Sequence, residues 1–503
     1  MSQRIREDFE QYAVSVVEAL RQKAQLERRG PVRLISHPDR EVRDAVALLE
    51  DDQPFGELVA TTRRAFHSKP SRRDESMWRH SVQSFFRRSG FYLRAAAGQA
   101  PPVDVVFAQY VGAFQSQERR VTYLAPIEHV YFARAQLDFG SFTVRRFSRD
   151  ELATLLETSV NRVFYEWALT EVRPLDDYWY VSLTKTLERR QPGEIRVNLA
   201  DIEKVTPTFT SFPQVEEALL PLVSFPWQAD LWRHEPREKQ EYWHGFRIPF
   251  LIVVDEDLLR PPRSRPDIAR LDREPDSDST TGEERDTERP VIWTHLDTQE
   301  TNTCEAFVRA IGDHVSLLAT QSIDWQFFER ARSYLLKGFF ADGLEQLLWH
   351  ITTVDALLGE DAPGAGTKRL ARRVAAILGT TAKEQDTIRG AFFELYHFRS
   401  RFVHGGPLEK HTLTKHLREA REIARTVLVW FVAFLTHMQD VARREQLPAF
   451  SRNDLLALID LNVKAKAELA TILKASDALP DGFPSVPSWL ASTPPQRTGI
   501  AGR

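Results

Sequence analysis

Residues 260–290 place the strongest constraint on how this chain of 503 residues can fold. The segment holds five prolines, nine acidic and seven basic residues, and its only aliphatic side chains besides alanine are Ile268 and Leu271. Such a composition buries too little apolar surface to offset the entropy lost on ordering, and proline interrupts helices and central strands. Because residues 291–294 look like another strand of the region before them, we predict a disordered insertion rather than a domain boundary.

The region before this insertion mixes helices and strands. Apolar side chains at helical spacing predict helices over residues 5–28 and 40–50. Residues 148–151 have capping-box spacing and predict the start of a helix that extends to about residue 162. Short runs rich in β-branched and aromatic residues predict strands at 103–107, 120–124, 130–132, 142–147, 179–183 and 246–254. We expect residues 1–320 to form a mixed α+β region.

The C-terminal part has helical patterning. At about 150 residues per domain, the chain length suggests three domains, or two with a large first one. We predict a helical domain over residues 321–475 and a flexible tail, rich in proline, serine and glycine, over 476–503. The longest apolar run, residues 427–435, is about half the length of a membrane span, so we predict a buried helix there.

Cysteine usage and the N-terminus indicate a cytoplasmic protein without a membrane segment. Cys304 is the only cysteine, which excludes a disulfide within the chain and a cysteine-based metal site. Residues 1–8 are too charged for a signal peptide. The absence of G-x-x-x-x-G-K-[ST], H-E-x-x-H and G-x-S-x-G argues against NTPases, zinc proteases and α/β-hydrolases. We expect no cofactor and no bound metal.

Residues 396–406 carry the most informative chemistry, with Arg399 and His404 five positions apart at the end of a helical segment. Arginine offers a permanent forked cation for phosphate oxygens, and histidine transfers protons near neutral pH. Residues 368–425 hold thirteen Lys/Arg against six Asp/Glu, although the net charge of the chain is −4. This local excess favours an anionic partner. The alternative is structural, since arginine and histidine also cap helix C-termini and charges also solvate helix faces.

These residues resemble the R-x4-H signature of HEPN-domain proteins, in the Y-x-x-R-S-x-x-V-H-G form of Apea-like HEPN domains. Residues 343–348, 354–358 and 368–378 are similar to the preceding family helices. The resemblance covers roughly residues 325–440. Asp355 stands where the family usually has glutamate, and Ser400 stands where many nuclease members have asparagine, aspartate or histidine.

The resemblance implies an all-α HEPN-type helical bundle with metal-independent endoribonuclease activity. His404 would be the general base or acid for the RNA 2′-OH or the leaving 5′-oxygen, and Arg399 would stabilise the phosphorane-like transition state. The product would carry a 2′,3′-cyclic phosphate. Asp355 would orient the pair, with Tyr396 and Ser400 in support. Candidates for RNA binding are Arg401, Lys368, Arg369, Arg372 and Arg373.

Five residues on an ideal helix span about 140°, so Arg399 and His404 do not share one face within a protomer. HEPN nucleases bring two motifs together by dimerising, and we expect a homodimer through the helical domain. The resemblance implies a bacterial anti-phage or toxin-type effector that cleaves tRNA or phage or host transcripts, with a trigger bound by the N-terminal region. The alternative is a catalytically inactive HEPN module for dimerisation or RNA binding in a regulatory protein.

The acidic run 255–257 could hold a divalent cation but lacks the glycine and spaced carboxylates of a calcium loop.

Overall fold

A computed structural model describes the greater part of the chain. The described residues are 3–27, 38–66, 75–128, 130–165, 175–189, 213–227, 246–248, 251–261, 294–319, 326–341, 343–360, 366–379, 381–405, 410–446 and 451–460. Nearly all of the predicted insertion, together with residues 291–293 and the predicted tail, lies outside these ranges.

The chain divides into two compact units that interleave along the sequence. The first unit comprises Met1–Glu128, Val144–Val205 and Ile248–Arg285. The second comprises His129–Thr143, Thr206–Arg247 and Asp286–Arg503. The predicted boundary between residues 320 and 321 therefore lies inside the second unit.

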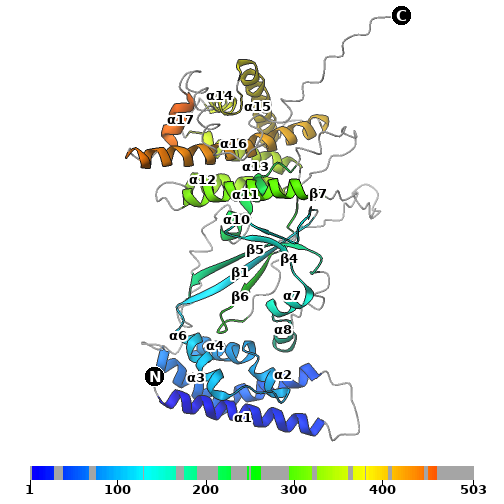
Figure 1. The fold of residues 1–503 in the computed structure, drawn as a ribbon, viewed down its shortest axis with the longest axis vertical. Helices are drawn as coiled ribbons and strands as arrows, with labels where there is room; N and C mark the ends of the chain where they lie inside the picture. The colour runs from blue at the N-terminus through cyan, green and yellow to red at the C-terminus, as the bar shows by residue number, and fades with distance from the viewer. Residues whose placement is uncertain are drawn as a thin grey trace, which may run out of the picture. The chain divides into compact units, whose positions relative to one another are not determined.

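The first unit begins with helices around an aromatic core. They are α1 (Gln3–Glu27), α2 (Pro38–Asp51), α3 (Gln53–Phe66), α4 (Glu75–Arg88), α5 (Phe91–Ala96) and α6 (Val103–Gln115) (Figure 1). Phe9 and Phe86 stack with ring centroids 5.4 Å apart, and the buried hydroxyls of Tyr12 and Tyr92 lie 2.6 Å apart. The helices predicted over residues 5–28 and 40–50 are confirmed as α1 and α2.

A small antiparallel sheet follows in the same unit. Strand β1 (Glu118–Ile127) pairs with β5 (Trp179–Glu188) on one side and with β6 (Ile252–Asp255) on the other. Strand β4 (Thr143–Arg146) neighbours β5. The register places Tyr123 between Leu183 and Val253. The mixed character predicted for the N-terminal half is confirmed.

Two local predictions differ from the structure. Residues 103–107 are not a strand but the start of α6, because Val106, Tyr110 and Phe114 bury one face at a spacing of four residues. That tertiary packing overrides the strand preference of β-branched residues. The helix predicted from residue 148 begins at a complete capping box, but it is two helices, α7 (Arg149–Leu155) and α8 (Thr158–Phe164). Glu157 separates them with a left-handed backbone, φ 47°.

Helices dominate the second unit. Its described strands are β2 (Val130–Phe132), β3 (Gln136–Asp138) and β7 (Thr294–Leu296), of which β2 and β7 pair in parallel. Its described helices are α10 (Pro213–Ser224), α11 (Thr298–Ala319), α12 (Gln326–Phe340), α13 (Gly343–Leu358), α14 (Gly366–Leu378), α15 (Ala382–Val403), α16 (Lys410–Arg444) and α17 (Arg452–Asp460). The prediction that the C-terminal half is helical is confirmed.

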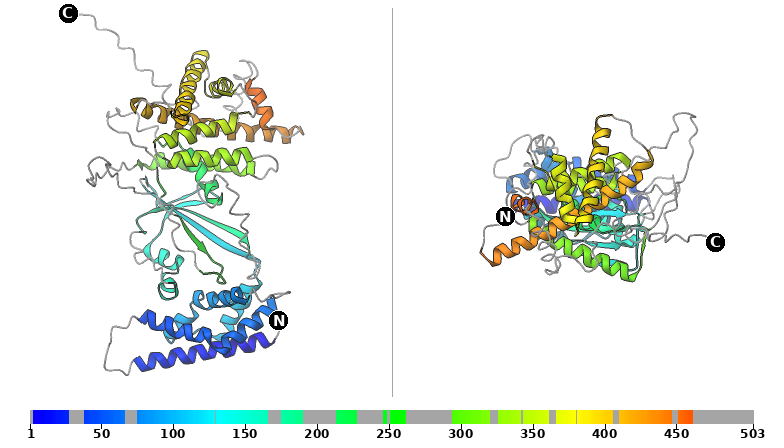
Figure 2. Two further views of the ribbon diagram at one scale, coloured as in Figure 1. Left: turned by 180° about the vertical axis from the view of Figure 1, so that it is seen from behind. Right: turned by 90° about the horizontal axis from the view of Figure 1, so that it is seen from above.

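Helix α16 is the centre of the second unit. It packs against α11, α12 and α13 as well as α14 and α15, and Figures 1 and 2 show it running between these two groups. Residues 427–435 form its buried middle, as predicted, with Val427, Phe431 and Leu435 fully inaccessible. No helix in the described ranges is long and apolar enough to cross a membrane.

Helices α12 and α13 approach closely at a glycine. A Cβ added to Gly338 would lie 2.8 Å from Nδ1 of His350, whose side chain is fully buried on α13. Burial lowers the pKa of His350 well below its ordinary value, so the ring is neutral in the core at neutral pH. Gly390 on α15 is a natural contrast, because an added Cβ there meets no atom within 4 Å.

We therefore predict opposite effects of alanine at these two helical glycines. Gly338→Ala should destabilise the protein by about 1–3 kcal/mol, because the methyl group collides with a ring that cannot move in a packed core. Gly390→Ala should stabilise it by up to about 1 kcal/mol through helix propensity. Urea unfolding followed by circular dichroism measures both, and a stable Gly338→Ala variant would contradict the close approach.

Candidate functional site

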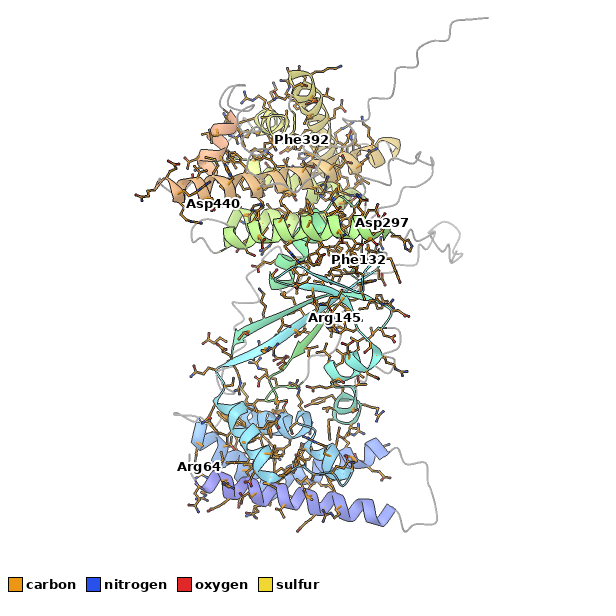
Figure 3. The ribbon with its side chains drawn as sticks, viewed as in Figure 1. Arg64, Phe132, Arg145, Asp297, Phe392 and Asp440 are labelled. Atoms are coloured by element: carbon orange, nitrogen blue, oxygen red, sulfur yellow. The ribbon has the colours of Figure 1, made fainter. Side chains whose placement is uncertain are left out.

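Helix α15 carries the Arg–His motif at its C-terminal end. It begins at a capping box between Thr381 and Glu384 and is anchored by buried side chains such as Phe392, which is labelled in Figure 3. His404 is the C-cap, and its backbone N–H donates to the carbonyl of Ser400 at 3.1 Å. Gly405 follows with φ 71°, the left-handed conformation that ends many helices. The motif histidine is thus fixed at a helix end by its backbone.

Arg399 lies half-buried on α15. Its guanidinium carbon lies 5.5 Å from the ring centroid of Tyr396, one turn earlier. Its Nε is buried and has no hydrogen-bond partner among the described residues. Within the described ranges, this donor of the Arg399 guanidinium is therefore unused.

Asp355 on α13 lies within electrostatic range of Arg399 on α15 and of Arg452 on α17. Desolvation raises the pKa of Asp355, although part of the residue surface is exposed, and the positive charges of Arg399 and Arg452 oppose that rise. The orienting role of Asp355 stays a prediction, because no hydrogen bond or ion pair among the described residues joins its carboxylate to Arg399.

The C-terminus of α13 is capped by two arginines. Arg452, at the start of α17, donates to the carbonyls of Ala356 and Leu357, each at 3.1 Å, and of Gly359 at 2.6 Å. Arg373 of α14 donates to the carbonyl of Leu358 at 2.6 Å. The last carbonyls of a helix have no partner within it and carry its negative dipole end, so two cations there are favourable.

Within one protomer, the described structure shows no hydrogen bond between the side chains of Arg399 and His404. His404 is exposed. The charge of Arg399 instead acts on Asp355 of α13. This arrangement agrees with the divergence expected for positions five residues apart on a helix.

The other predicted site residues occupy varied positions. Ser400 is half-buried, and Arg401 is exposed with its guanidinium 5.8 Å from the Phe398 ring. Lys368 and Arg372 are exposed one turn apart on α14. Arg369 forms an ion pair with Glu360.

Arg373 is unsuited to the RNA-binding role predicted for it. Its side chain is 2% exposed, it forms an ion pair with Glu360, and its Nε donates to Asp460 at 3.0 Å. Each of these contacts stabilises the junction of α13, α14 and α17. We therefore leave Arg373 out of the set of RNA-binding candidates.

Sequence reasoning missed Arg452 and a buried pair on α16. His416 Nδ1 lies 3.4 Å from Glu419, and the His416 ring packs 4.8 Å from that of Phe398, next to Arg399. The spacing of three residues between His416 and Glu419 is a signal that could have found this pair. Arg452 gives no such signal, because its partners lie more than ninety residues away along the chain.

The acidic run 255–257 does not offer its buried carboxylates to a cation. Asp255 pairs with Arg119, and Asp257 pairs with Arg189 and Arg260. Across the described ranges, no group of three or more histidine, cysteine or acidic side chains has an arrangement that could hold a metal ion.

Comparison with known proteins gives no family for this chain, since no family model, curated protein or solved structure matches it. The HEPN assignment remains a prediction from the residues themselves.

We predict that the cap at α13 contributes more to stability than the carboxylate beside it. Arg452→Met should lower the free energy of unfolding by about 1–3 kcal/mol, because three carbonyls lose a charged donor. Asp355→Asn should not destabilise the protein at neutral pH. Desolvation raises the pKa of this carboxyl, so its ionised form opposes folding at neutral pH, and this cost disappears as pH falls and the carboxyl protonates. Thermal unfolding at pH 7 and pH 4.5 tests both, and equal losses in the two variants at pH 7 would contradict this account.

Proposed function

We propose that this protein is a metal-independent endoribonuclease of the HEPN type, whose active site contains Arg399 and His404. The observation that carries the proposal is the position of Arg399, half-buried with a buried Nε that has no described hydrogen-bond partner. It lies in a helical unit close to an acidic side chain of a second helix. A permanent cation of this kind suits the negative charge that develops on a phosphodiester during cleavage.

The proposed reaction uses only groups of the chain and of the RNA. His404 accepts the proton of the ribose 2′-OH, whose oxygen attacks the adjacent phosphorus, while Arg399 stabilises the added negative charge. The 5′-oxygen leaves with a proton donated by the protonated His404 of the second copy in the proposed dimer, and the phosphate closes into a 2′,3′-cyclic phosphate. The exposure of His404 supports this role, because its imidazole can reach an external substrate. Asp355 would hold Arg399 in place, and Tyr396 would support the guanidinium with its ring face.

The proposed active unit is a homodimer through the helical domain. Because Arg399 and His404 diverge within one protomer, a two-fold contact would bring two motifs into one cleft. Exposed Lys368, Arg372 and Arg401 would then extend the positive field along the bound RNA. The proposed setting is cytoplasmic, as an anti-phage or toxin-type effector acting on tRNA or on phage or host transcripts, with a trigger recognised by the N-terminal region.

The second candidate is a catalytically inactive HEPN module for dimerisation or RNA binding. The separation of Arg399 from His404 within the protomer favours it if no dimer forms. The basic residues of α14 and α15 would serve RNA binding in either case, so cleavage is the discriminating property.

We predict that Arg399→Ala and His404→Ala each reduce RNA cleavage by about 10²–10⁴-fold, because each removes a group that acts on the transition state. Matched controls come from the same helix. His397→Ala and Arg389→Ala remove an exposed histidine and an exposed arginine to which the resemblance assigns no role, and these variants should cleave normally. The measurement is the rate of cleavage of total RNA and of tRNA by folded variants. A wild-type protein that cuts neither substrate would favour the inactive module, and full activity in both alanine variants would place the site elsewhere.

Assembly provides an independent prediction. Light scattering should give the wild-type protein twice its chain mass of 57.9 kDa. Heterodimers of Arg399→Ala with His404→Ala should remain largely inactive, because the shared cleft would retain one histidine, whereas the proposed reaction needs one to accept the 2′-OH proton and one to protonate the 5′-oxygen. A strictly monomeric protein with full activity would rule out the composite cleft.

A further inference from the structure

A cluster of buried charges lies in the first unit, where strand β6 ends. Three of its guanidinium groups contact the carboxylates of Asp255 and Asp257, which are 1% and 8% exposed. A fourth, that of Arg88, donates to Glu157 and to the backbone carbonyls of residues 255, 257 and 260. The cluster therefore consists of Arg88, Arg119, Arg189 and Arg260 with Glu157, Asp255 and Asp257.

Each carboxylate oxygen of the two buried aspartates already contacts at least one donor. In Asp255, Oδ1 accepts the backbone N–H of Asp257 at 3.1 Å, and Oδ2 contacts Arg119. In Asp257, Oδ1 accepts the backbone N–H of Leu259 at 3.1 Å, and Oδ2 lies 3.1 Å from Nε of Arg189 and 3.3 Å from Nε of Arg260. Rotating these side chains towards another donor would therefore break existing contacts.

Two guanidinium N–H groups of the cluster nevertheless have no acceptor among the described residues. Arg189 is 6% exposed, and its Nη1 donates to the carbonyls of Ala113 and Ser116, but its Nη2 is buried without a described hydrogen-bond partner. Nε of Arg119 is also buried without one. Burial lowers the pKa of Arg189 even though both aspartates oppose that shift. Among the described residues, these two donors have no acceptor, and the four cations of the cluster face three carboxylates.

We infer that this cluster binds a small oxyanion, such as a phosphate group, between Arg119 and Arg189. An oxyanion supplies acceptor oxygens and the missing negative charge together, whereas a water molecule supplies only the acceptor. Both guanidiniums contact the same short segment, residues 255–257, so one small anion can be shared between them. The Arg119 side chain is 17% exposed and the Arg189 side chain only 2%, so Arg119 gives access from solvent and Arg189 lies beneath. This site is independent of the proposed nuclease.

Titration of the full chain with inorganic phosphate tests the inference, with chloride at equal ionic strength as the blank. Isothermal calorimetry should show saturable binding to the wild-type protein. Arg119→Gln should weaken it by about tenfold or more, the effect of losing one charge-assisted hydrogen bond. Arg120→Gln is the matched control, because Arg120 is the next residue on the same strand, with a 63% exposed side chain and an ion-pair distance of 3.9 Å to Glu256. It should bind phosphate within about twofold of wild type.

A second variant distinguishes loss of phosphate binding from loss of folding. Arg189→Lys keeps the buried charge but removes the guanidinium fork, and it should also weaken phosphate binding while thermal unfolding shows a cooperative transition. A nucleoside triphosphate that binds more tightly than phosphate would assign the anion to a nucleotide, and binding of phosphate alone would assign it to the free ion. Absence of saturable binding to the wild-type protein, or equal binding by Arg119→Gln and Arg120→Gln, would overturn the inference.

Discussion

The packing of the helices in the second unit depends on the hydrogen bonds that the last carbonyls of α13 accept. The four carbonyls of residues 356–359 accept hydrogen bonds from Arg452 and Arg373, which come from α17 and α14. Because unpaired carbonyls are costly in a protected environment, this contact fixes three helices at one point. Asp355, one residue before the capped carbonyls, lies within electrostatic range of Arg399 on α15 and of Arg452. The geometry of the proposed site thus follows from a backbone requirement at a helix end.

The elements that the sequence predicts well are those whose signal is local. The capping box at residues 148–151 needs only side chains three residues apart, and the buried run 427–435 needs only apolar composition. Residues 103–107 mislead because their β-branched side chains indicate a strand, while the surrounding aromatic core stabilises a helix. The break at Glu157 depends on a contact with Arg88, sixty-nine residues away, so no local pattern could reveal it.

The same limit applies to the candidate site. The spacing of Arg399 and His404 is visible in the sequence, and so is their divergence on a helix. Arg373 and Arg372 are equivalent by composition, yet one is buried against Asp460 and the other is exposed. The composition of the acidic run 255–257 suggests a cation site. In the structure, however, Asp255 and Asp257 are paired with three arginines. Whether a charged segment attracts a cation or an anion therefore depends on partners distant in the sequence, which a local sequence pattern does not reveal.

The central claim is that Arg399 and His404 cleave RNA through the ribose 2′-OH without a metal ion. Analysis of the product ends after incubation with tRNA in excess EDTA tests it most directly. The account predicts 2′,3′-cyclic phosphate ends from the wild-type protein and none from His404→Ala. Products with free 3′-hydroxyl ends, or cleavage that appears only when magnesium or manganese is added, would contradict it.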